Sequence, residues 1–277
     1  METKYSVLMS IYIREKPEQL ALSIDSMLNQ TMRPDEIVIV KDGPVTEEIE
    51  ILLSRYVDMN PDMFKIVSLE VNQGLGLALN EGIKMCTHEL IARMDADDIS
   101  YKNRCETQLM EFTIDSTLDI IGTLTSEFYD TPDKIISSRI VPETHADIVK
   151  FSKRRSPFNH PTVMYKKSAV EAVGGYRDIL RKEDIDLFAR MLNNGCKAKN
   201  IPKPLLYFRS DRNSYKRRKS WTNNKNYIGV IYEFWKRGYS STWDLVYVIV
   251  TQIGMFLAPT WFLKLLSDNF LRKRVDV

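Results

Sequence analysis

The sequence predicts an α/β protein with a mostly parallel central sheet flanked by helices. Its first hundred residues alternate between short apolar runs and segments with helical spacing, as consecutive βαβ units do. Two of the apolar runs end in aspartates, at Asp42 and Asp95. With 277 residues, of which 44% are hydrophobic, the chain is long enough to bury a full α/β core.

The elements of the first half are expected in alternating order. Strands are predicted from short apolar runs at residues 6–11, 36–40, 64–69 and 89–94. The helices between them are predicted at residues 17–30, 46–58 and 75–85. In the first helix Leu20, Ile24 and Leu28 share one face, and Thr46 can cap the second. Because such strands are joined by right-handed crossovers, they should pair in parallel.

After residue 98 the alternation is weaker. The elements predicted there are a helix at 103–113, strands at 120–128 and 134–140, and an αβ unit at 168–208 whose clearest helix is 184–192. A basic loop at 211–220 and helices at 227–235 and 243–266 follow. We therefore divide the chain into two halves of one domain, residues 1–98 and 99–210, and a helical tail at 211–277.

Cysteine content and charge limit the compartment and the partners. Cys86, Cys105 and Cys196 are far apart and form no CxxC pair, which favours a reducing compartment over a disulfide framework or a zinc site. The first apolar stretch is too short for a secretory signal, so we expect the amino terminus in the cytoplasm. Residues 211–277 contain 12 Lys/Arg against 5 Asp/Glu, a net charge of +7, whereas the rest carries −5. The tail should therefore meet an anionic partner.

The acidic cluster Asp95-Ala96-Asp97-Asp98 directly follows the predicted strand at 89–94. Three carboxylates so close together repel one another unless solvent or a cation offsets the repulsion. Such hard oxygen ligands suit Mg²⁺ or Mn²⁺ with a phosphate as co-ligand. Ligands of open α/β sheets bind outside the carboxyl ends of the strands, so Asp42 should face the same crevice. A merely solvated turn is the alternative; an EF-hand loop is disfavoured because Ser100 stands where it needs glycine.

Five segments resemble family 2 glycosyltransferases in their order and spacing, over about residues 5–210. The segments are residues 7–12, Asp42-Gly43, residues 72–76, Asp95-Ala96-Asp97-Asp98 and Glu183-Asp184. The resemblance is to the bacterial polysaccharide and lipopolysaccharide enzymes of that family. It implies a GT-A (Rossmann-like) fold, a nucleotide-sugar donor, by default a UDP-sugar, and inversion at the anomeric carbon. It also implies that residues 1–98 bind the donor, and that residues 99–210 bind the acceptor and carry the catalytic base.

The resemblance assigns roles on the donor side. Asp42 should meet the base or ribose, although it could simply form the turn before Gly43. Asp95 should face the ribose and the metal, Asp97 should ligate the metal, and Asp98 is an alternative ligand. The remaining donor-binding candidates are Ser10, Tyr12, Asn72, Gly74 and Arg93. The glycines at 74 and 76 could instead serve packing, and Arg93 could pair with neighbouring carboxylates rather than phosphate. The implied cofactor is Mn²⁺ or Mg²⁺.

On the acceptor side, the resemblance identifies Asp184 as the base that takes the proton of the acceptor hydroxyl, with Glu183 as helper or alternative. Acidic residues in a first helical turn could also simply complement the helix dipole. His160 is a candidate for the acceptor or diphosphate site, although a lone histidine is more often structural. Arg155, in the basic run 153–155, is a second candidate, and an ordinary solvated loop is the alternative.

Residues 245–263 contain no charged side chain and approach the length of ~20 residues that a membrane helix requires. Trp243, Tyr247 and Trp261 could sit at the headgroup level, and a basic run follows at 272–274. We favour a helix lying in the membrane surface; a true span and a soluble core helix are the alternatives. Nucleic acid is not an expected partner, because the basic residues are not interleaved with a recognisable binding module.

These features predict an inverting, metal-dependent glycosyltransferase that extends a lipid-linked glycan at the cytoplasmic face of the cell membrane. One alternative is a non-catalytic protein that binds a nucleotide-sugar and a membrane. Another is a sugar nucleotidyltransferase, which is disfavoured because residues 10–14 lack the glycine-rich loop expected there.

Overall fold

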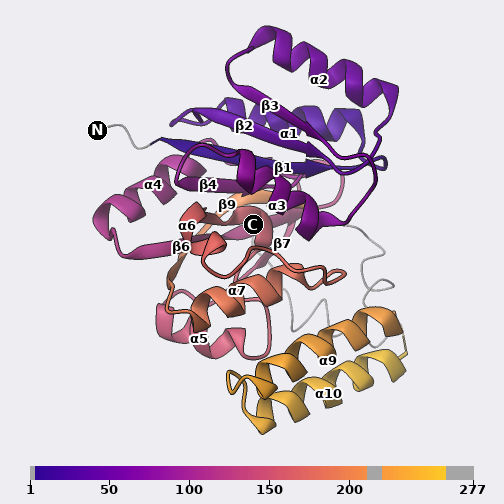
Figure 1. Cartoon of the computed structure of the whole chain (residues 1–277), viewed down its shortest axis with the longest axis vertical. Helices are drawn as coiled ribbons and strands as arrows, with labels where there is room; N and C mark the ends of the chain where they lie inside the picture. Colours follow the sequence, from indigo (N-terminus) through magenta and orange to yellow (C-terminus); the bar gives the residue numbers. More distant parts are fainter. Residues whose placement is uncertain (1–3, 211–219, 260–277) are drawn as a thin grey trace.

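The computed structural model describes residues 4–210 and 220–259. Its core is a nine-stranded sheet with the order β3-β2-β1-β4-β8-β6-β9-β5, in which β7 pairs with β6. Helices lie on both faces of this sheet, and a pair of C-terminal helices extends beyond it (Figure 1). The expected loop at 211–219, Trp261 and the basic run 272–274 lie outside the described residues.

The donor half is the parallel βαβ array that the sequence predicts. Its strands are β1 (Tyr5–Ile11), β2 (Glu36–Lys41), β3 (Phe64–Ser68) and β4 (Leu90–Met94), all paired in parallel. Its helices are α1 (Pro17–Leu28), α2 (Glu47–Met59) and α3 (Leu75–Met85). Alternate residues of β1 enter opposite cores: Val7 and Met9 pack with α1 and α2, whereas Leu8 packs with α3.

The second half extends the sheet with mixed pairing. It contains β5 (Ile99–Ser100), α4 (Arg104–Ile114), β6 (Leu118–Phe128), β7 (Ile135–Arg139), α5 (His145–Ser152), the 3₁₀ turn η1 (His160–Thr162), β8 (Met164–Lys166), α6 (Lys167–Glu171), α7 (Glu183–Asn193) and β9 (Lys197–Arg209). The short strand β8 joins the halves, because it pairs antiparallel with both β4 and β6. Strands β6 and β9 then pair in parallel.

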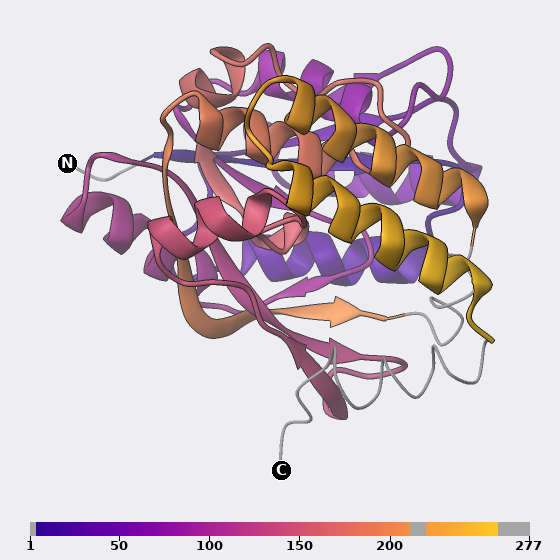
Figure 2. The same ribbon diagram turned by 90° about the horizontal axis from the view of Figure 1, so that it is seen from below.

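The last two described helices, α9 (Trp221–Lys236) and α10 (Thr242–Leu257), form a hairpin that packs on α7 (Figure 2). Their contact with α7 is apolar and includes Ile185 of α7 and Phe234 of α9. The predicted helix at 243–266 is wrong in its end: α10 stops at Leu257, and Ala258 is extended. Pro259 explains this, because a proline disfavours the helical conformation of the residue before it. Within the described residues, no helix is both long and apolar enough to cross a bilayer.

Candidate active site

A cavity of about 780 Å³ opens at the carboxyl ends of β1, β2 and β4 and reaches the start of α7. The predicted site residues in its lining are Ser10, Tyr12, Asp42, Asn72, Gly74, Asp95, Asp97 and Glu183. The predicted residues outside that lining are Arg93, Asp98, Arg155, His160 and Asp184. The expected convergence of Asp42 with the acidic cluster is therefore present.

The acidic cluster has the close, mutually repelling carboxylates that are typical of a cation site. Carboxylate oxygens of Asp95, Asp97 and Asp98 lie within 4.8 Å of one another. Asp98 is fully buried: one of its oxygens accepts the backbone N–H of Arg209 at 2.8 Å, and the other has no partner within the described structure. Burial and the charge of Asp95 raise the pKa of Asp97 to about 6. A divalent cation would offset this repulsion, and the burial of Asp98 argues against a merely solvated turn.

Neighbouring elements hold the backbone of this cluster. Ser23 of α1 donates its hydroxyl to the Asp95 carbonyl at 2.7 Å, and Arg209 donates Nε–H to the Asp97 carbonyl at 2.9 Å. Arg93 is buried and forms an ion pair with Asp95, whereas its Nε and Nη1 have no partner among the described residues. Arg93 thus neutralises a neighbouring carboxylate from behind the cavity.

Asp42 shapes the loop that precedes α3. Its two carboxylate oxygens accept the backbone N–H groups of Gln73 at 2.7 Å and Gly74 at 3.0 Å. Gly43 makes this approach possible, because a Cβ there would lie 2.8 Å from the backbone nitrogen of Asn72. Gly43 also has a φ of +83°, which favours glycine. Each carboxylate oxygen keeps a second lone pair, so Asp42 can still accept a hydrogen bond from a ligand.

Glu183 reaches the cavity because the start of α7 lies against α3. A Cβ on Gly76 would lie 3.1 Å from Glu183 Cβ and 3.2 Å from Tyr176 Cβ, so glycine permits this close packing. Asn80 of α3 fixes the approach to α7: its amide donates to the Tyr176 carbonyl and its oxygen accepts the Tyr176 N–H, both at 2.8 Å. Burial and the charge of Asp184 raise the pKa of Glu183 to about 7. Glu183 is therefore poised to exchange a proton near neutral pH.

Asp184 and His160 lie beside the cavity rather than in its lining. Asp184 is half-buried, and its charge acts on Arg139 and Tyr227. Nε2 of His160 lies 2.8 Å from the hydroxyl of Tyr176, and burial lowers the pKa of the His160 ring. His160 thus supports the segment that leads to α7.

The sequence analysis missed several lining residues, including Glu15, Arg139, Lys182 and Arg209. Burial and the charges of Asp97 and Asp95 raise the pKa of Glu15 to about 7. The position of Glu15 just beyond β1 was a usable signal, because the carboxyl ends of the strands had already identified Asp42 and Asp95. The three cationic residues follow no comparable spacing.

Comparisons with known proteins agree with this arrangement. The model of Glycosyl transferase family 2 matches residues 6–174. The UDP-Gal:alpha-D-GlcNAc-diphosphoundecaprenol beta-1,3-galactosyltransferase of Escherichia coli is 37% identical over 98% of this chain and 97% of its own length. The amylovoran biosynthesis glycosyltransferase AmsE of Erwinia amylovora is 38% identical over 81% of each chain.

Solved structures confirm the predicted GT-A fold. The mannosyltransferase PcManGT from Pyrobaculum calidifontis, in complex with GDP-Man and Mn²⁺, has a TM-score of 0.66 at 15% identity and covers 95% of this chain and 73% of its own. TarS 1–349 of S. aureus, in complex with UDP, has a TM-score of 0.60 at 17% identity and covers 87% of this chain and 73% of its own.

Proposed function

The chain belongs to glycosyl transferase family 2, and from this membership we propose that it is an inverting, metal-dependent glycosyltransferase. It moves a sugar from a nucleotide-sugar, by preference a UDP-sugar, to a lipid-linked saccharide in cell-surface polysaccharide or O-antigen synthesis. The observation that supports this proposal best is the convergence of Asp42, the acidic cluster and Glu183 on one cavity. The Escherichia coli relative is named for a UDP-Gal donor and a GlcNAc-diphosphoundecaprenol acceptor, and the Erwinia amylovora relative for amylovoran biosynthesis, which supports these classes.

On the donor side, residues 1–98 bind the nucleotide-sugar. Asp42 accepts hydrogen bonds from the base or ribose through its remaining lone pairs. Asn72 and Gly74 border the diphosphate near the amino terminus of α3, where backbone N–H groups favour an anion. Asp95, Asp97 and Asp98 would hold Mn²⁺ or Mg²⁺, since their oxygens lie together and one buried oxygen lacks a partner. Such an ion would neutralise charge on the leaving nucleoside diphosphate.

On the acceptor side, residues 99–210 position the hydroxyl that attacks the anomeric carbon. We assign Asp184 as the base that takes its proton and Glu183, whose pKa is raised to about 7, as the helper that supports this base in its ionised form. The cavity position of Glu183 makes it the second candidate for the base. Attack from the side opposite the leaving diphosphate inverts the configuration of the transferred sugar.

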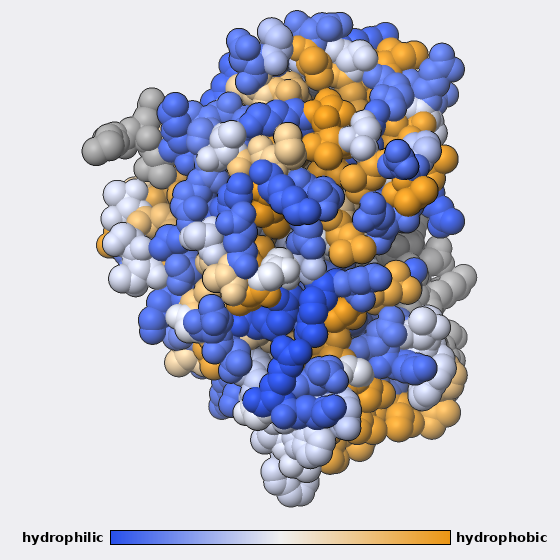
Figure 3. Space-filling model, in the orientation of Figure 1, coloured by the Kyte–Doolittle hydropathy of each residue, from blue (hydrophilic) through white to orange (hydrophobic). Residues whose placement is uncertain are grey.

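The tail at 211–277 associates with the cytoplasmic face of the cell membrane without spanning it. Along α10, Trp243, Tyr247, Val250 and Leu257 are 79%, 50%, 63% and 71% exposed. Their spacing of three, four and seven residues places them on one helical face. Figure 3 shows hydrophobic side chains gathered over this lower part of the molecule. Asn223 of α9 lines the cavity, so the same hairpin borders the acceptor side.

A transfer assay tests the proposal. The full chain is mixed with a panel of nucleotide-sugars, Mn²⁺ or Mg²⁺, and N-acetylglucosamine linked through α-diphosphate to an undecyl chain. We expect one donor to raise the melting temperature and to yield a disaccharide-diphosphate lipid with inverted linkage, in a reaction that EDTA abolishes. Donor binding without turnover on this and other lipid-linked sugars would instead favour a binding protein. Full turnover in the presence of EDTA would show that the transfer does not require a divalent metal.

A further inference from the structure

The guanidinium of Arg139 is a cation of the cavity wall that has no direct partner among the described residues. Arg139 ends β7 and lines the cavity, and its guanidinium forms no hydrogen bond or ion pair in the described part of the chain. The residue as a whole is exposed to solvent. The protein around its guanidinium nevertheless removes part of the hydration of the charge, which lowers the pKa of Arg139. Asp184 and Glu127 raise that pKa, whereas the nearby charge of Arg155 lowers it further. The charges of two carboxylates and of a second guanidinium thus act on Arg139, although no direct ion pair forms among the described residues.

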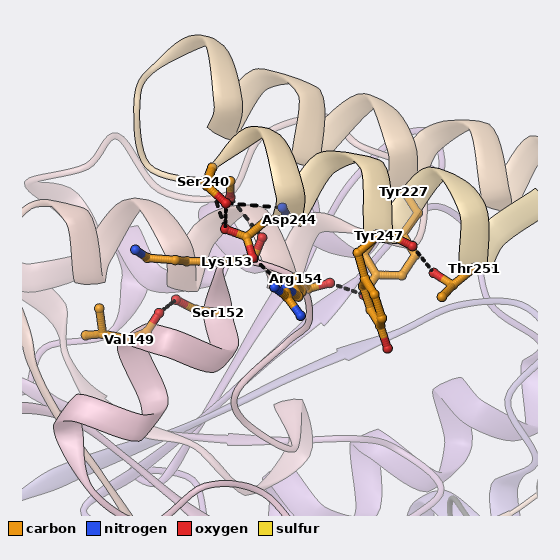
Figure 4. Close-up of polar contacts among 10 residues, drawn as sticks. Val149, Ser152, Lys153, Arg154, Tyr227, Ser240, Asp244, Tyr247 and Thr251 are labelled. Atoms are coloured by element: carbon orange, nitrogen blue, oxygen red, sulfur yellow. Dashed lines mark hydrogen bonds and ion pairs between the residues drawn. The ribbon is translucent and has the colours of Figure 1, made fainter.

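The hairpin α9–α10 fixes the segment that carries Arg155. Figure 4 shows side chains of both helices and the turn between them directed at residues 152–154. Ser240 donates its hydroxyl to the Lys153 carbonyl at 2.8 Å, and Tyr227 donates to the Arg154 carbonyl at 2.5 Å. Asp244 forms an ion pair with the Arg154 guanidinium.

These contacts separate the roles of two neighbouring arginines. Arg154 has a structural role: its guanidinium forms an ion pair with Asp244, and its guanidinium carbon lies 4.7 Å from the centroid of the Tyr247 ring. Arg155 is exposed and has no ion-pair partner within the described residues. Its guanidinium carbon lies 5.2 Å from the ring of Phe151. The hairpin thus holds the backbone at Lys153 and Arg154, next to Arg155, whose charge remains available.

Tyr227 lies at the centre of this cationic group. Nζ of Lys182, which lines the cavity, is 5.0 Å from the centroid of the Tyr227 ring. Burial raises the pKa of Tyr227; the charges of Arg155 and Arg139 lower it, and that of Asp184 raises it. Lys182 therefore lies against the ring of the half-buried Tyr227, and the charges of Arg139, Arg155 and Asp184 act on the same side chain.

We propose that Arg139 and Arg155, with Lys182 beside them, form a second anion subsite that binds the diphosphate of the lipid-linked acceptor. Guanidinium groups suit this ligand, because their planar array of donors matches phosphate oxygens in pairs. The inference rests on the proposed function and deepens it, since it specifies which part of the acceptor is recognised.

The location of the subsite agrees with the chemistry of such an acceptor. In a sugar-diphosphate lipid, the diphosphate is attached to the same sugar whose hydroxyl attacks. Its binding site must therefore lie about one sugar ring from the base, and Arg139 lies within electrostatic range of Asp184. The lipid chain would then leave along the hairpin, whose α10 carries the exposed apolar face.

Two acceptors test the proposal: the undecyl diphosphate of α-N-acetylglucosamine and the undecyl glycoside of the same sugar, with one donor. The readout is the ratio of kcat/KM for the two acceptors. Arg139→Gln and Arg155→Gln should each lower this preference for the diphosphate about 10- to 100-fold, the range of a hydrogen bond between charged groups. The matched control Arg55→Gln removes the same charge from the exposed surface of α2 and should keep the preference. An unchanged ratio in both Arg139→Gln and Arg155→Gln would overturn the proposal.

A binding measurement keeps the inference testable if no transfer is found. Undecyl diphosphate, without a sugar, is titrated calorimetrically into the protein saturated with UDP and Mn²⁺. Arg139→Gln should weaken binding at least tenfold, and Arg55→Gln should not. Inorganic pyrophosphate, titrated in parallel, should compete, which would show that the phosphates rather than the alkyl chain carry recognition. Equal binding by wild type, Arg139→Gln and Arg155→Gln would reject the subsite, whatever the outcome of the transfer assay.

Discussion

The donor and acceptor sides of the cavity are built in different ways. On the donor side the polar groups are held by the protein itself: Asp42 accepts two backbone N–H groups, and the carbonyls of Asp95 and Asp97 accept hydrogen bonds from Ser23 and Arg209. On the acceptor side the carbonyl of Arg139 accepts a hydrogen bond from Asn159, but its guanidinium has no hydrogen-bond or ion-pair partner among the described residues. The comparison indicates a donor site that is rigid before binding and an acceptor site that its ligand completes.

The two sides also differ in how the sequence encodes them. The donor residues come in contiguous groups: 42–43 and 95–98 directly follow β2 and β4, and 72–76 lies in the loop between β3 and α3 and at the start of α3. The acceptor residues come from β7, from the segment after α5, from α7 and from α9. Changes on the donor side should therefore abolish the chemistry, whereas changes on the acceptor side should alter rate, selectivity or location. Five variants test this division, from the largest expected effect to the smallest.

Asp97→Asn should have the largest effect. It removes one negative charge from the cation site while keeping the shape of the side chain, so we expect transfer to fall about 1,000-fold or more. The melting temperature should stay near that of wild type, because the fold uses the carbonyl of Asp97. Transfer is measured at several Mn²⁺ concentrations, and Asp58→Asn on the exposed surface of α2 is the control. Undiminished transfer would show that the donor side does not depend on this carboxylate.

The acidic pair at the start of α7 gives the next effect. Asp184→Asn should lower kcat about 100- to 10,000-fold, the usual contribution of a general base. Glu183→Gln should lower it only about tenfold, because glutamine resembles the protonated helper. The opposite ranking would identify Glu183 as the base.

The pH profile sharpens this test. The raised pKa of Glu183, about 7, means that its carboxyl is protonated below that pH and ionised above it. The wild-type rate should therefore decline as the pH falls through about 7, toward the level of Glu183→Gln. In Glu183→Gln this step should be absent; a step that remains would point to Glu15, whose pKa is also raised to about 7. Persistence of the step would assign it to another residue.

The sequence predicted much of the donor side, for a physical reason. Parallel strands buried on both faces read as continuous apolar runs, and β1–β4 were located to within one or two residues. The predicted helix at 75–85 coincides with α3. The carboxyl-end rule then placed Asp42 and the acidic cluster together, although their roles remain predictions.

The acceptor side could not be read in the same way. β8 has three residues, too few for any periodicity to be visible, yet it joins the two halves of the sheet. No sequence pattern indicates that the charge of Arg155 acts on Arg139. The sequence also gave no sign that Asp244 would neutralise Arg154 and leave Arg155 available.

Val250→Glu tests the membrane contact of the hairpin. Val250 is 63% exposed on α10, so the change should leave the melting temperature unaltered. A charge on this face opposes burial among acyl chains and should weaken association with phosphatidylglycerol-containing vesicles about tenfold in cosedimentation. Ile51→Glu, at a 47% exposed position on α2, adds the same charge elsewhere and is the matched control. Equal weakening by both variants would indicate nonspecific repulsion by the anionic surface.

Gly76→Ala should have the smallest effect, and it tests whether the contact between α3 and α7 joins the two sides. The added Cβ would lie 3.1 Å from Glu183 Cβ and 3.3 Å from the Arg177 carbonyl oxygen, so the start of α7 must shift by a few tenths of an ångström. We expect kcat to fall several-fold, with the KM of the donor unchanged.

Stability distinguishes this displacement from general damage. Alanine is favoured over glycine inside a helix by about 1 kcal/mol, which should offset the tighter contact and keep the free energy of unfolding near the wild-type value. Gly229→Ala in α9 has no heavy atom within 4 Å of the new Cβ, so it should gain that stability and keep full kcat. If Gly76→Ala also keeps full kcat, Glu183 and Asp184 can keep their catalytic positions after the start of α7 has shifted. The position of α7 would then depend less on its contact with α3 than the close packing at Gly76 suggests.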